Sequence, residues 1–418
     1  MRKKILFGIL ATATILIVTI IGCTKTSNSF SLNSITAGGV DLNTATAPSG
    51  VPFNATITAT FSSDVNATTA TSANIQLLDY AANVIPTTIS ASGPTVTIMP
   101  TVKLGSGTIY TLSISALFAG ANGTVLGAVT RSFKTTGAFT PAGQVAYWNF
   151  EGNANDQIGS FSPAGTANVI DITYAAGRNT SAGQAAVFNG TTSLIEIPNG
   201  DQLLNCTDFS LSFWVNVDSA LQSDQFVMGL AGWNGFQFEI NNHGNAMLGE
   251  CKLAAQYSLS GGTTASQDLW FNGAATNSTL ANGGWQGWTY CKDLTTNGTG
   301  VKSLLNKVWA NVVCTYDATT KLGTIYINGV KMKQQDFNLY GTTHPLYNAT
   351  GLKINSAVVN KNFVFGFIQD KGNPSITDSW ADETITTNGH FKGMLDDVAI
   401  YHRVLTTTEI GLMYASTK

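Results

Sequence analysis

The stretch Phe209–Val215, with the sequence FSLSFWV, decides the fold of the larger part of this 418-residue chain. Phe209, Leu211, Phe213 and Val215 fall on one face of a strand, because successive side chains of a strand point to opposite sides. This alternation is typical of a strand that buries one side in a core. A second sheet must cover that side, so the stretch predicts a sandwich.

The same pattern recurs further along the chain. Ile325 and Ile327 share one face of the run Gly323–Ile327, and Asn328-Gly329 is a signal for a hairpin turn. Only 11% of the residues are charged, while Thr, Ser, Asn, Ala and Gly are abundant. Since β-branched residues suit strands and Gly and Asn suit turns, this composition predicts an all-β protein. Two sheets packed face to face would give a jelly roll.

Several segments of residues 143–418 form an ordered set. They are Val145–Gly152, Val187–Gly190, Leu194–Pro198, Phe209–Val215, Trp309–Asp317, Gly323–Gly329 and Phe391–Leu405, followed by Glu409-Ile410. In this order they resemble the laminin-G-like, concanavalin-A-like lectin/glucanase family. The resemblance implies a concanavalin-A-like jelly-roll sandwich that recognises carbohydrate. Thr406 to Tyr414 can add a short terminal helix, with Thr406 as N-cap and Glu409 completing a capping box.

Residues 32–138 show a separate β pattern, made of short runs with a period of two between turn residues. The runs are Ala55–Phe61, Thr95–Ile98 and Tyr110–Ile114. Phe61–Val65, Leu104–Leu112 and Arg131–Thr135 resemble the immunoglobulin-like domains repeated in bacterial surface proteins. An immunoglobulin-like sandwich is therefore expected here. It contains no cluster of titratable residues, which favours a spacer, although a partner-binding surface stays open.

The N-terminus has the pattern of an export signal. Arg2, Lys3 and Lys4 precede the apolar run Ile5–Ile21, and Cys23 follows directly after Gly22. The end of this run resembles the lipobox of bacterial lipoproteins, which implies a signal peptide over 1–22, lipidation of Cys23 and a tether over 23–31. The alternative is a plain membrane anchor. With lipidation, the protein would be held by acyl chains at a membrane of the bacterial cell envelope, at the outer membrane or cell surface.

The charge pattern excludes one class of function and weakens another. The formal net charge is −3, so there is no basic field to hold nucleic acid. Glycosidases need two carboxylates facing each other across a cleft. The resembling glucanases place both acids on one strand, whereas Phe238–Asn241 (FEIN) has an amide at the second position. We therefore expect a non-catalytic protein that binds a polysaccharide or glycan, with a glycoside hydrolase or a structural adhesive protein as alternatives.

Asp396 is the acid of greatest interest. It has the same parity as Met394, Val398 and Ile400, which predicts a buried carboxylate that must be paired or bound to a metal. Asp397 is then expected on the opposite face. The family resemblance implies a structural calcium site that includes Asp396 and Glu151. A salt bridge from Asp396 to Arg403 or Lys392 is the alternative.

An insertion over residues 250–300 departs from the family pattern. Cys251 and Cys291 flank it, and export permits disulfides, so a Cys251–Cys291 bridge is the favoured pairing. Cys206 and Cys314 are expected to be small core residues.

The insertion is also rich in aromatic residues. Trp270, Trp285, Trp288 and Tyr290 lie within it. Aromatic faces can stack on the apolar faces of sugar rings. These four residues are the predicted ligand-binding site, and a small satellite core under the loop is the alternative for each tryptophan.

Overall fold

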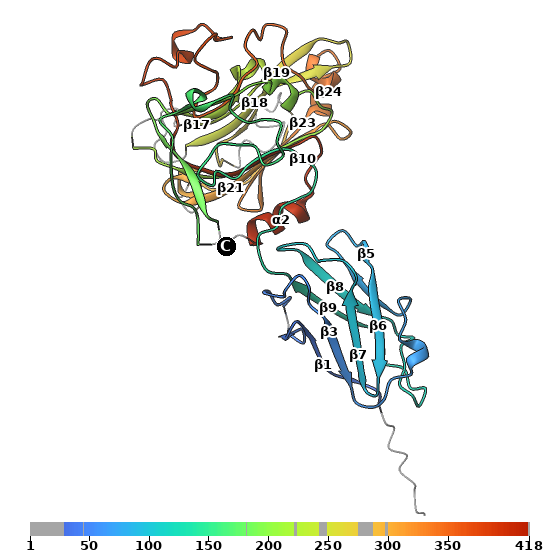
Figure 1. Ribbon diagram of the computed structural model, residues 1–418. Helices are drawn as coiled ribbons and strands as arrows, with labels where there is room; N and C mark the ends of the chain where they lie inside the picture. The colour runs from blue at the N-terminus through green and yellow to red at the C-terminus, as the bar shows by residue number, and fades with distance from the viewer. Residues whose placement is uncertain are drawn as a thin grey trace, which may run out of the picture.

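The computed structural model describes residues 29–44, 46–180, 182–220, 224–241, 249–274, 287–296 and 300–416. These residues form two β-sandwiches joined end to end, with helix α2 (Thr407–Ser416) between them (Figure 1). The predicted all-β fold is confirmed. Cys23 and Trp285, two of the predicted functional residues, lie outside the described residues.

The N-terminal sandwich packs a five-stranded sheet on a four-stranded one. The first has the order β2-β1-β3-β7-β6 and the second β5-β4-β8-β9. The strands are β1 (Leu32–Ala37), β2 (Val40–Asp41), β3 (Ile57–Phe61), β4 (Ile75–Leu78), β5 (Val84–Ile85), β6 (Thr87–Ser92), β7 (Thr95–Pro100), β8 (Ile109–Ile114) and β9 (Val129–Lys134). Phe61, Phe118 and Phe133 are fully buried between the two sheets.

The C-terminal sandwich consists of a nine-stranded and an eight-stranded sheet. The nine-stranded sheet has the order β12-β13-β26-β15-β21-β22-β23-β20, with β10 paired to β26. Its strands are β10 (Gln144–Trp148), β12 (Thr173–Ala176), β13 (Gln184–Asn189), β15 (Phe209–Val217), β20 (Trp288–Cys291), β21 (Trp309–Asp317), β22 (Leu322–Ile327), β23 (Val330–Asp336) and β26 (Lys392–Tyr401).

The eight-stranded sheet has the order β11-β14-β25-β16-β17-β18-β19, with β24 paired to β18. Its strands are β11 (Val169–Ile170), β14 (Leu194–Ile197), β16 (Gln225–Leu230), β17 (Phe236–Asn241), β18 (Glu250–Leu259), β19 (Thr264–Phe271), β24 (Ala349–Leu352) and β25 (Phe363–Phe365). The short helices are α1 (Lys302–Leu305), η1 (Ala67–Thr69), η2 (Thr166–Asn168), η3 (Gly200–Leu203), η4 (Gly232–Asn234), η7 (Phe337–Leu339), η8 (Pro345–Asn348) and η9 (Ser379–Ala381). None of the described helices is long and apolar enough to cross a membrane.

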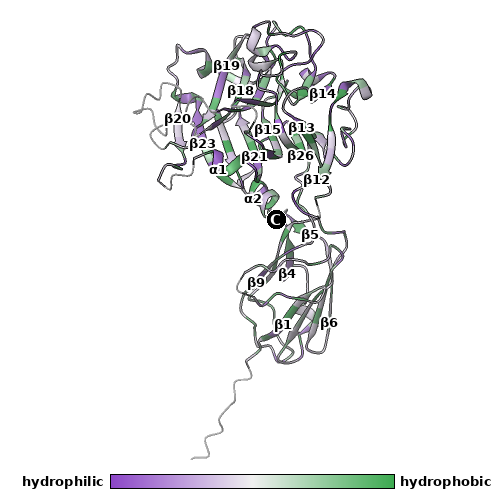
Figure 2. Ribbon diagram, turned by 90° about the vertical axis from the view of Figure 1, so that its left-hand side faces the viewer, coloured by the Kyte–Doolittle hydropathy of each residue, from purple (hydrophilic) through white to green (hydrophobic). Residues whose placement is uncertain are grey.

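The core of this sandwich lies between the two sheets. Phe209, Leu211 and Phe213 are fully buried there, as their alternation predicts. The ring of Phe213 packs against the ring of Phe238, which comes from the opposite sheet. The two rings have an edge-to-face geometry, with 4.9 Å between their centroids. Along the strands hydrophobic and hydrophilic residues are mixed, consistent with one buried side per strand (Figure 2).

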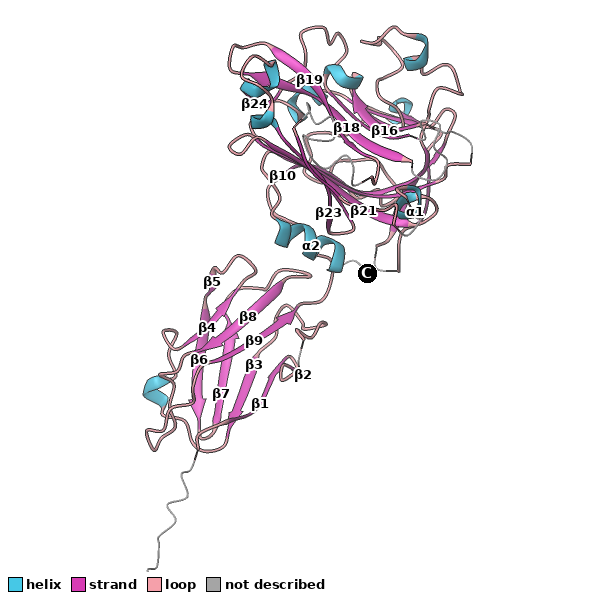
Figure 3. Cartoon of the chain, turned by 180° about the vertical axis from the view of Figure 1, so that it is seen from behind, coloured by secondary structure: helices cyan, strands magenta, loops and turns pink. Residues whose placement is uncertain are grey.

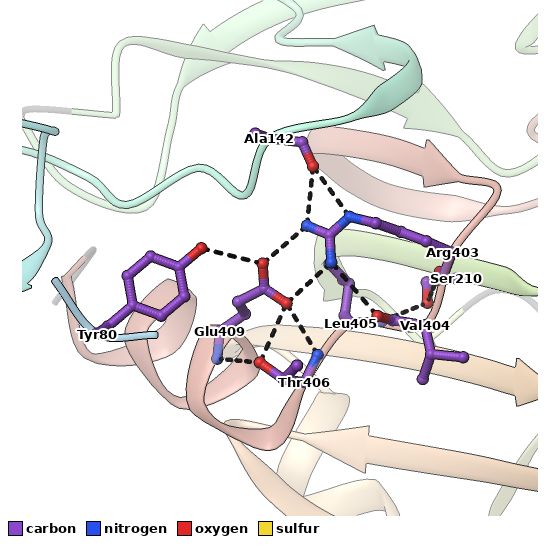
Figure 4. A network of polar contacts seen from close by, with 8 residues as sticks. All are labelled: Tyr80, Ala142, Ser210, Arg403, Val404, Leu405, Thr406 and Glu409. Atoms are coloured by element: carbon purple, nitrogen blue, oxygen red, sulfur yellow. Dashed lines mark hydrogen bonds and ion pairs between the residues drawn. The ribbon is translucent and has the colours of Figure 1, made fainter. Parts of the chain in front are cut away.

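Helix α2 packs on the outer face of the nine-stranded sheet and faces the N-terminal sandwich (Figure 3). The capping box is confirmed: Glu409 N–H donates to Thr406 Oγ1 at 3.2 Å, and Thr406 N–H donates to Glu409 Oε2 at 2.9 Å. Glu409 also pairs with Arg403 at 2.7 Å and accepts from Tyr80 of the N-terminal sandwich at 3.3 Å (Figure 4). The helix therefore connects the two domains through the same carboxylate that caps it.

Candidate functional site

Four side chains form one row across the outer face of the eight-stranded sheet. Phe226 on β16 is opposite Glu239 on β17, Glu239 is opposite Lys252 on β18, and Lys252 is opposite Trp270 on β19. Directly opposed residues of antiparallel strands point to the same side, and strands lie about 4.8 Å apart, so the row is roughly 14 Å long. We call it the outer-face row.

The centre of the outer-face row is charged. Lys252 Nζ lies 2.5 Å from Glu239 Oε1 and 3.1 Å from Asp268 Oδ2. Glu239 is buried, with 5% of its side chain exposed, whereas 45% of the Asp268 side chain reaches solvent. The Lys252 ammonium thus lies between two carboxylates and bridges them.

One end of the row is extended by a tryptophan pair. Trp233 in η4 and Trp380 in η9 stack at 5.4 Å between centroids, with 22° between their planes. Trp380 also contacts Phe226 at 6.0 Å and is 38% exposed. Trp233 packs on a small apolar cluster that includes Phe226, on the same outer face. Aromatic surface therefore stands at both ends of the row, with Trp270 at the other end.

Of the predicted aromatic residues, Trp270 belongs to this row and Trp288 does not. Trp270 is half-buried on edge strand β19. Trp288 is only 9% exposed, its ring centroid lies 5.5 Å from that of Trp270, and Lys333 Nζ lies 3.9 Å from its centroid. Lys333 is itself fully buried, and burial lowers its pKa to about 8. The prediction that Trp288 stands exposed as a ligand platform is wrong, because Trp270 and Lys333 pack against its ring and it is buried.

Tyr290 is the last of the predicted aromatic residues of the insertion. Tyr290 is half-buried, with Lys331 Nζ 4.8 Å from its ring centroid.

The predicted Cys251–Cys291 disulfide is wrong for this structure, in which Cys206, Cys251, Cys291 and Cys314 are free thiols. Cys251 and Cys291 lie on opposite sheets within the hydrophobic core, where burial raises the pKa of the Cys291 thiol. Both therefore act as small core residues, the role expected for Cys206 and Cys314.

The structure also corrects the placement of Asp396 and Asp397. Between Ser212 and Trp214 the register with β26 shifts by one extra residue on β26, and Asp397 has a φ of +46°. This bulge breaks the simple alternation, since Leu395 and Val398 both enter the core. The two aspartates consequently share the outer face of the nine-stranded sheet, although strict alternation places them on opposite faces.

Arg178 is the partner of both aspartates. Its guanidinium contacts Asp396 Oδ2, reaches Asp397 Oδ2 at 2.6 Å, and lies 4.6 Å from the ring centroid of Trp214. Burial and the neighbouring Asp397 raise the pKa of Asp396 to about 8, so Asp396 holds a proton near neutral pH. The expected salt bridges are absent from the described residues: Arg403 pairs with Glu409, and Lys392 with Asp218.

The residues proposed for calcium do not fit that ion. Glu151 lies near Asp396, as the resemblance implies, but its carboxylate accepts the Gln184 N–H at 2.9 Å. Arg178 already supplies the positive charge beside Asp396. Calcium needs six to eight oxygen ligands. Among the described residues, no group of three or more His, Cys, Asp or Glu could hold a metal ion.

The sequence analysis missed three residues that lie on the outer faces of the two sheets. Trp233 and Trp380 lie on the eight-stranded sheet, and Arg178 lies on the nine-stranded sheet. Trp233 stands in the turn Gly232–Gly235 directly after a strand, which is a recognisable signal for an exposed aromatic residue. Arg178 and Trp380 lie outside regular strands, and nothing in their local sequence marks them.

Comparison with known proteins defines the class of each domain. Residues 40–135 match the family model described as bacterial Ig-like domain, and residues 189–370 match the concanavalin A-like lectin/glucanases superfamily. The chain thus carries a bacterial immunoglobulin-like domain followed by a concanavalin-A-like sandwich, as the sequence predicts. No curated protein matches the chain in sequence.

Similar solved structures include domains of two other proteins. One is domain 4 of AbnA, a GH43 extracellular arabinanase from Geobacillus stearothermophilus, in complex with arabinotriose, with 19% identity over 66% of this chain and 100% of that one and a TM-score of 0.38. Another is the receptor binding domain of botulinum neurotoxin mosaic serotype C/D, with 15% identity over 65% of this chain and 50% of that one and a TM-score of 0.40. The match therefore spans half of the neurotoxin domain. At such identities function must be inferred from this chain's own residues.

Proposed function

We propose that the protein binds a glycan chain along the outer-face row and performs no chemistry on it. The observation that carries this proposal is the row itself: an exposed aromatic ring, Trp380, beside one end and a half-buried one, Trp270, at the other, with charged hydrogen-bonding groups between them. Aromatic rings can stack on sugar rings, while carboxylates and an ammonium can bond to hydroxyls. The lectin/glucanase superfamily of this domain supports a carbohydrate ligand.

The charge arrangement supports binding over hydrolysis. A glycosidase needs one carboxyl group as acid and another as nucleophile or base, set apart around the glycosidic bond. Glu239 and Asp268 are the two acids of the row, and Lys252 contacts both. Because both acids pair with the same ammonium, we infer that neither serves as catalytic acid or nucleophile. A glycoside hydrolase remains the second candidate, because two acids do meet on one sheet face.

The N-terminal part of the proposal concerns location. We propose that acylation of Cys23 holds the protein at a membrane of the bacterial envelope and that the immunoglobulin-like domain acts as a spacer. Replacing Cys23 with Ala should release the protein into the soluble fraction. A variant that stays in the membrane after an alkaline wash would contradict the lipid anchor.

A glycan-array screen with the chain from residue 24 onward tests the binding function. We expect retention of a defined group of glycans, with no release of reducing sugar from them on long incubation. Binding to no glycan on the array would contradict the proposal. Release of reducing ends that is lost in Glu239→Gln would establish the hydrolase instead.

A further inference from the structure

A separate cavity of about 190 Å³ lies on the other side of the domain, where it meets residues 135–143, the linker between the two sandwiches. Its floor is the outer face of the nine-stranded sheet, with Ser212, Asp397 and Tyr401 among the residues that line it. Linker residue Phe139 and helix residue Met413 form part of its wall. An engineered cavity of about 150 Å³ accommodates benzene. This cavity is therefore large enough for one six-membered ring.

Buried polar groups without partners surround the cavity. Ser212 Oγ, Tyr401 Oη and Arg178 Nε are buried, and none has a hydrogen-bond partner among the described residues. Ser212 is 1% exposed and Tyr401 is fully buried. Nearly all buried polar groups in proteins have a partner. Three such groups around one cavity indicate that the partner is a molecule held inside it.

The chemistry of the lining restricts that molecule. Ser212, Tyr401 and Arg178 offer N–H or O–H donors, while Asp397 and Glu151 offer carboxylate acceptors. An anion would be repelled by the carboxylates, and a metal ion would be repelled by Arg178. A molecule that both donates and accepts through hydroxyl groups satisfies both sets.

We propose that this junction cavity binds one polyhydroxylated ring of monosaccharide size. The site is distinct from the outer-face row, which lies on the opposite sheet of the sandwich. Because linker residues line the cavity, a bound sugar would contact both the C-terminal sandwich and the segment that leads to the immunoglobulin-like domain. The ligand would thus stabilise the junction as well as the sandwich.

Titration of the full chain with free aldohexoses and aldopentoses, monitored by calorimetry and by thermal melting, tests this proposal. The test variants are Ser212→Ala and Tyr401→Phe, which remove hydroxyl groups without a protein partner and should therefore leave the melting temperature of the free protein unchanged. We expect one sugar to bind at millimolar concentration or tighter and to raise the melting temperature. Each variant should weaken this binding about fivefold, the effect of one lost hydrogen bond.

Matched controls separate this site from the outer-face row. Trp270→Ala should leave monosaccharide binding at the junction unchanged, and Ser212→Ala should leave glycan binding at the outer-face row unchanged. The proposal is overturned if no sugar binds, in which case water is the partner of the three groups. It is equally overturned if binding persists in the Ser212→Ala, Tyr401→Phe double variant or is lost in Trp270→Ala.

Discussion

The two outer faces of the C-terminal sandwich carry the same arrangement of charge, one cation between two acids, but differ in how far water reaches the cation. On the eight-stranded sheet, Lys252 lies between Glu239 and Asp268, with 20% of the lysine side chain exposed. On the nine-stranded sheet, Arg178 contacts Asp396 and Asp397, with only 4% of the arginine side chain exposed. The first face meets solvent, whereas helix α2 and the linker enclose part of the second.

This difference indicates how one sandwich can use one face to bind a ligand and the other face to stabilise its own fold. A charged group that water reaches can exchange its protein partner for a ligand at little cost, because exposed ion pairs contribute little to stability. A buried pair cannot be broken without leaving an uncompensated charge. The group of Lys252, Glu239 and Asp268, in which water reaches Lys252 and Asp268, therefore suits the recognition of an extended ligand. The buried Arg178–Asp396 pair fixes the loop that carries Arg178 against the sheet.

The largest expected effect comes from removing the central cation on each face. Arg178→Met should lower the free energy of unfolding by about 3 kcal/mol or more, because the Asp397 carboxylate and the Asp396 carboxyl group lose their shared buried partner. Lys252→Met should cost less, about 2 kcal/mol, because only one of its two partners, Glu239, is buried and solvent reaches Lys252 and Asp268. Denaturant unfolding of both variants measures the two values. Equal losses would remove the distinction between the faces.

The tryptophans of the insertion give the next comparison. Trp288→Ala should cost about 3–5 kcal/mol, the usual loss for a buried aromatic side chain. Trp270→Ala should cost clearly less, since this ring is half-buried on an edge strand. Thermal melting of the two variants provides the measurement. A Trp288→Ala protein as stable as the wild type would show that this ring is not a packing residue and would favour the original prediction that it binds the ligand.

The proton held by Asp396 predicts a smaller, pH-dependent effect. The folded-state pKa of Asp396 is about 8, above the value of about 3.9 expected in the unfolded chain. The folded state therefore binds more protons between these two values, and stability falls as the pH rises from about 4 to 8. Asp396→Asn removes this contribution. Its melting temperature should fall less than that of the wild type between pH 5 and pH 8, and parallel curves would contradict the assignment.

The smallest expected effect is the response to calcium. Because Arg178 provides the cation beside Asp396, chelation should leave the melting temperature of the C-terminal sandwich unchanged. Melting curves in calcium and in a chelator provide the measurement. A lower melting temperature in chelator that is lost in Asp396→Asn would show that a metal site exists after all.

Local sequence patterns predicted the core strands and the terminal helix of this protein well. The alternation in Phe209–Val215 identified a core strand, and the spacing of Thr406 and Glu409 identified the start of helix α2. Both features depend on neighbours in the chain. Such patterns lie within a few consecutive residues, so the strand and the helix start can be predicted without knowing the fold.

The candidate site depends on contacts that local signals do not contain. The bulge at Asp397 reverses the parity of β26, and its one extra residue is visible only once β15 is paired with that strand. Trp288 is buried through contacts with Trp270 and with Lys333 of β23, and Arg178 reaches the aspartates from a separate loop. Trp380 joins Trp233 only through the folding of a distant segment over the sheet. Sequence patterns identified Trp270, but could not show which residues share its face.

The most direct test of the central claim is the affinity of single tryptophan variants for a glycan that the array identifies. Calorimetry should show that Trp270→Ala and Trp380→Ala each weaken binding at least tenfold, or about 1.4 kcal/mol, because each removes an aromatic end of the outer-face row. Trp309→Ala, on β21 of the other sheet, is the matched control and should bind as the wild type does. Unchanged affinity in both Trp270→Ala and Trp380→Ala, with folding intact, would contradict a glycan site on this face.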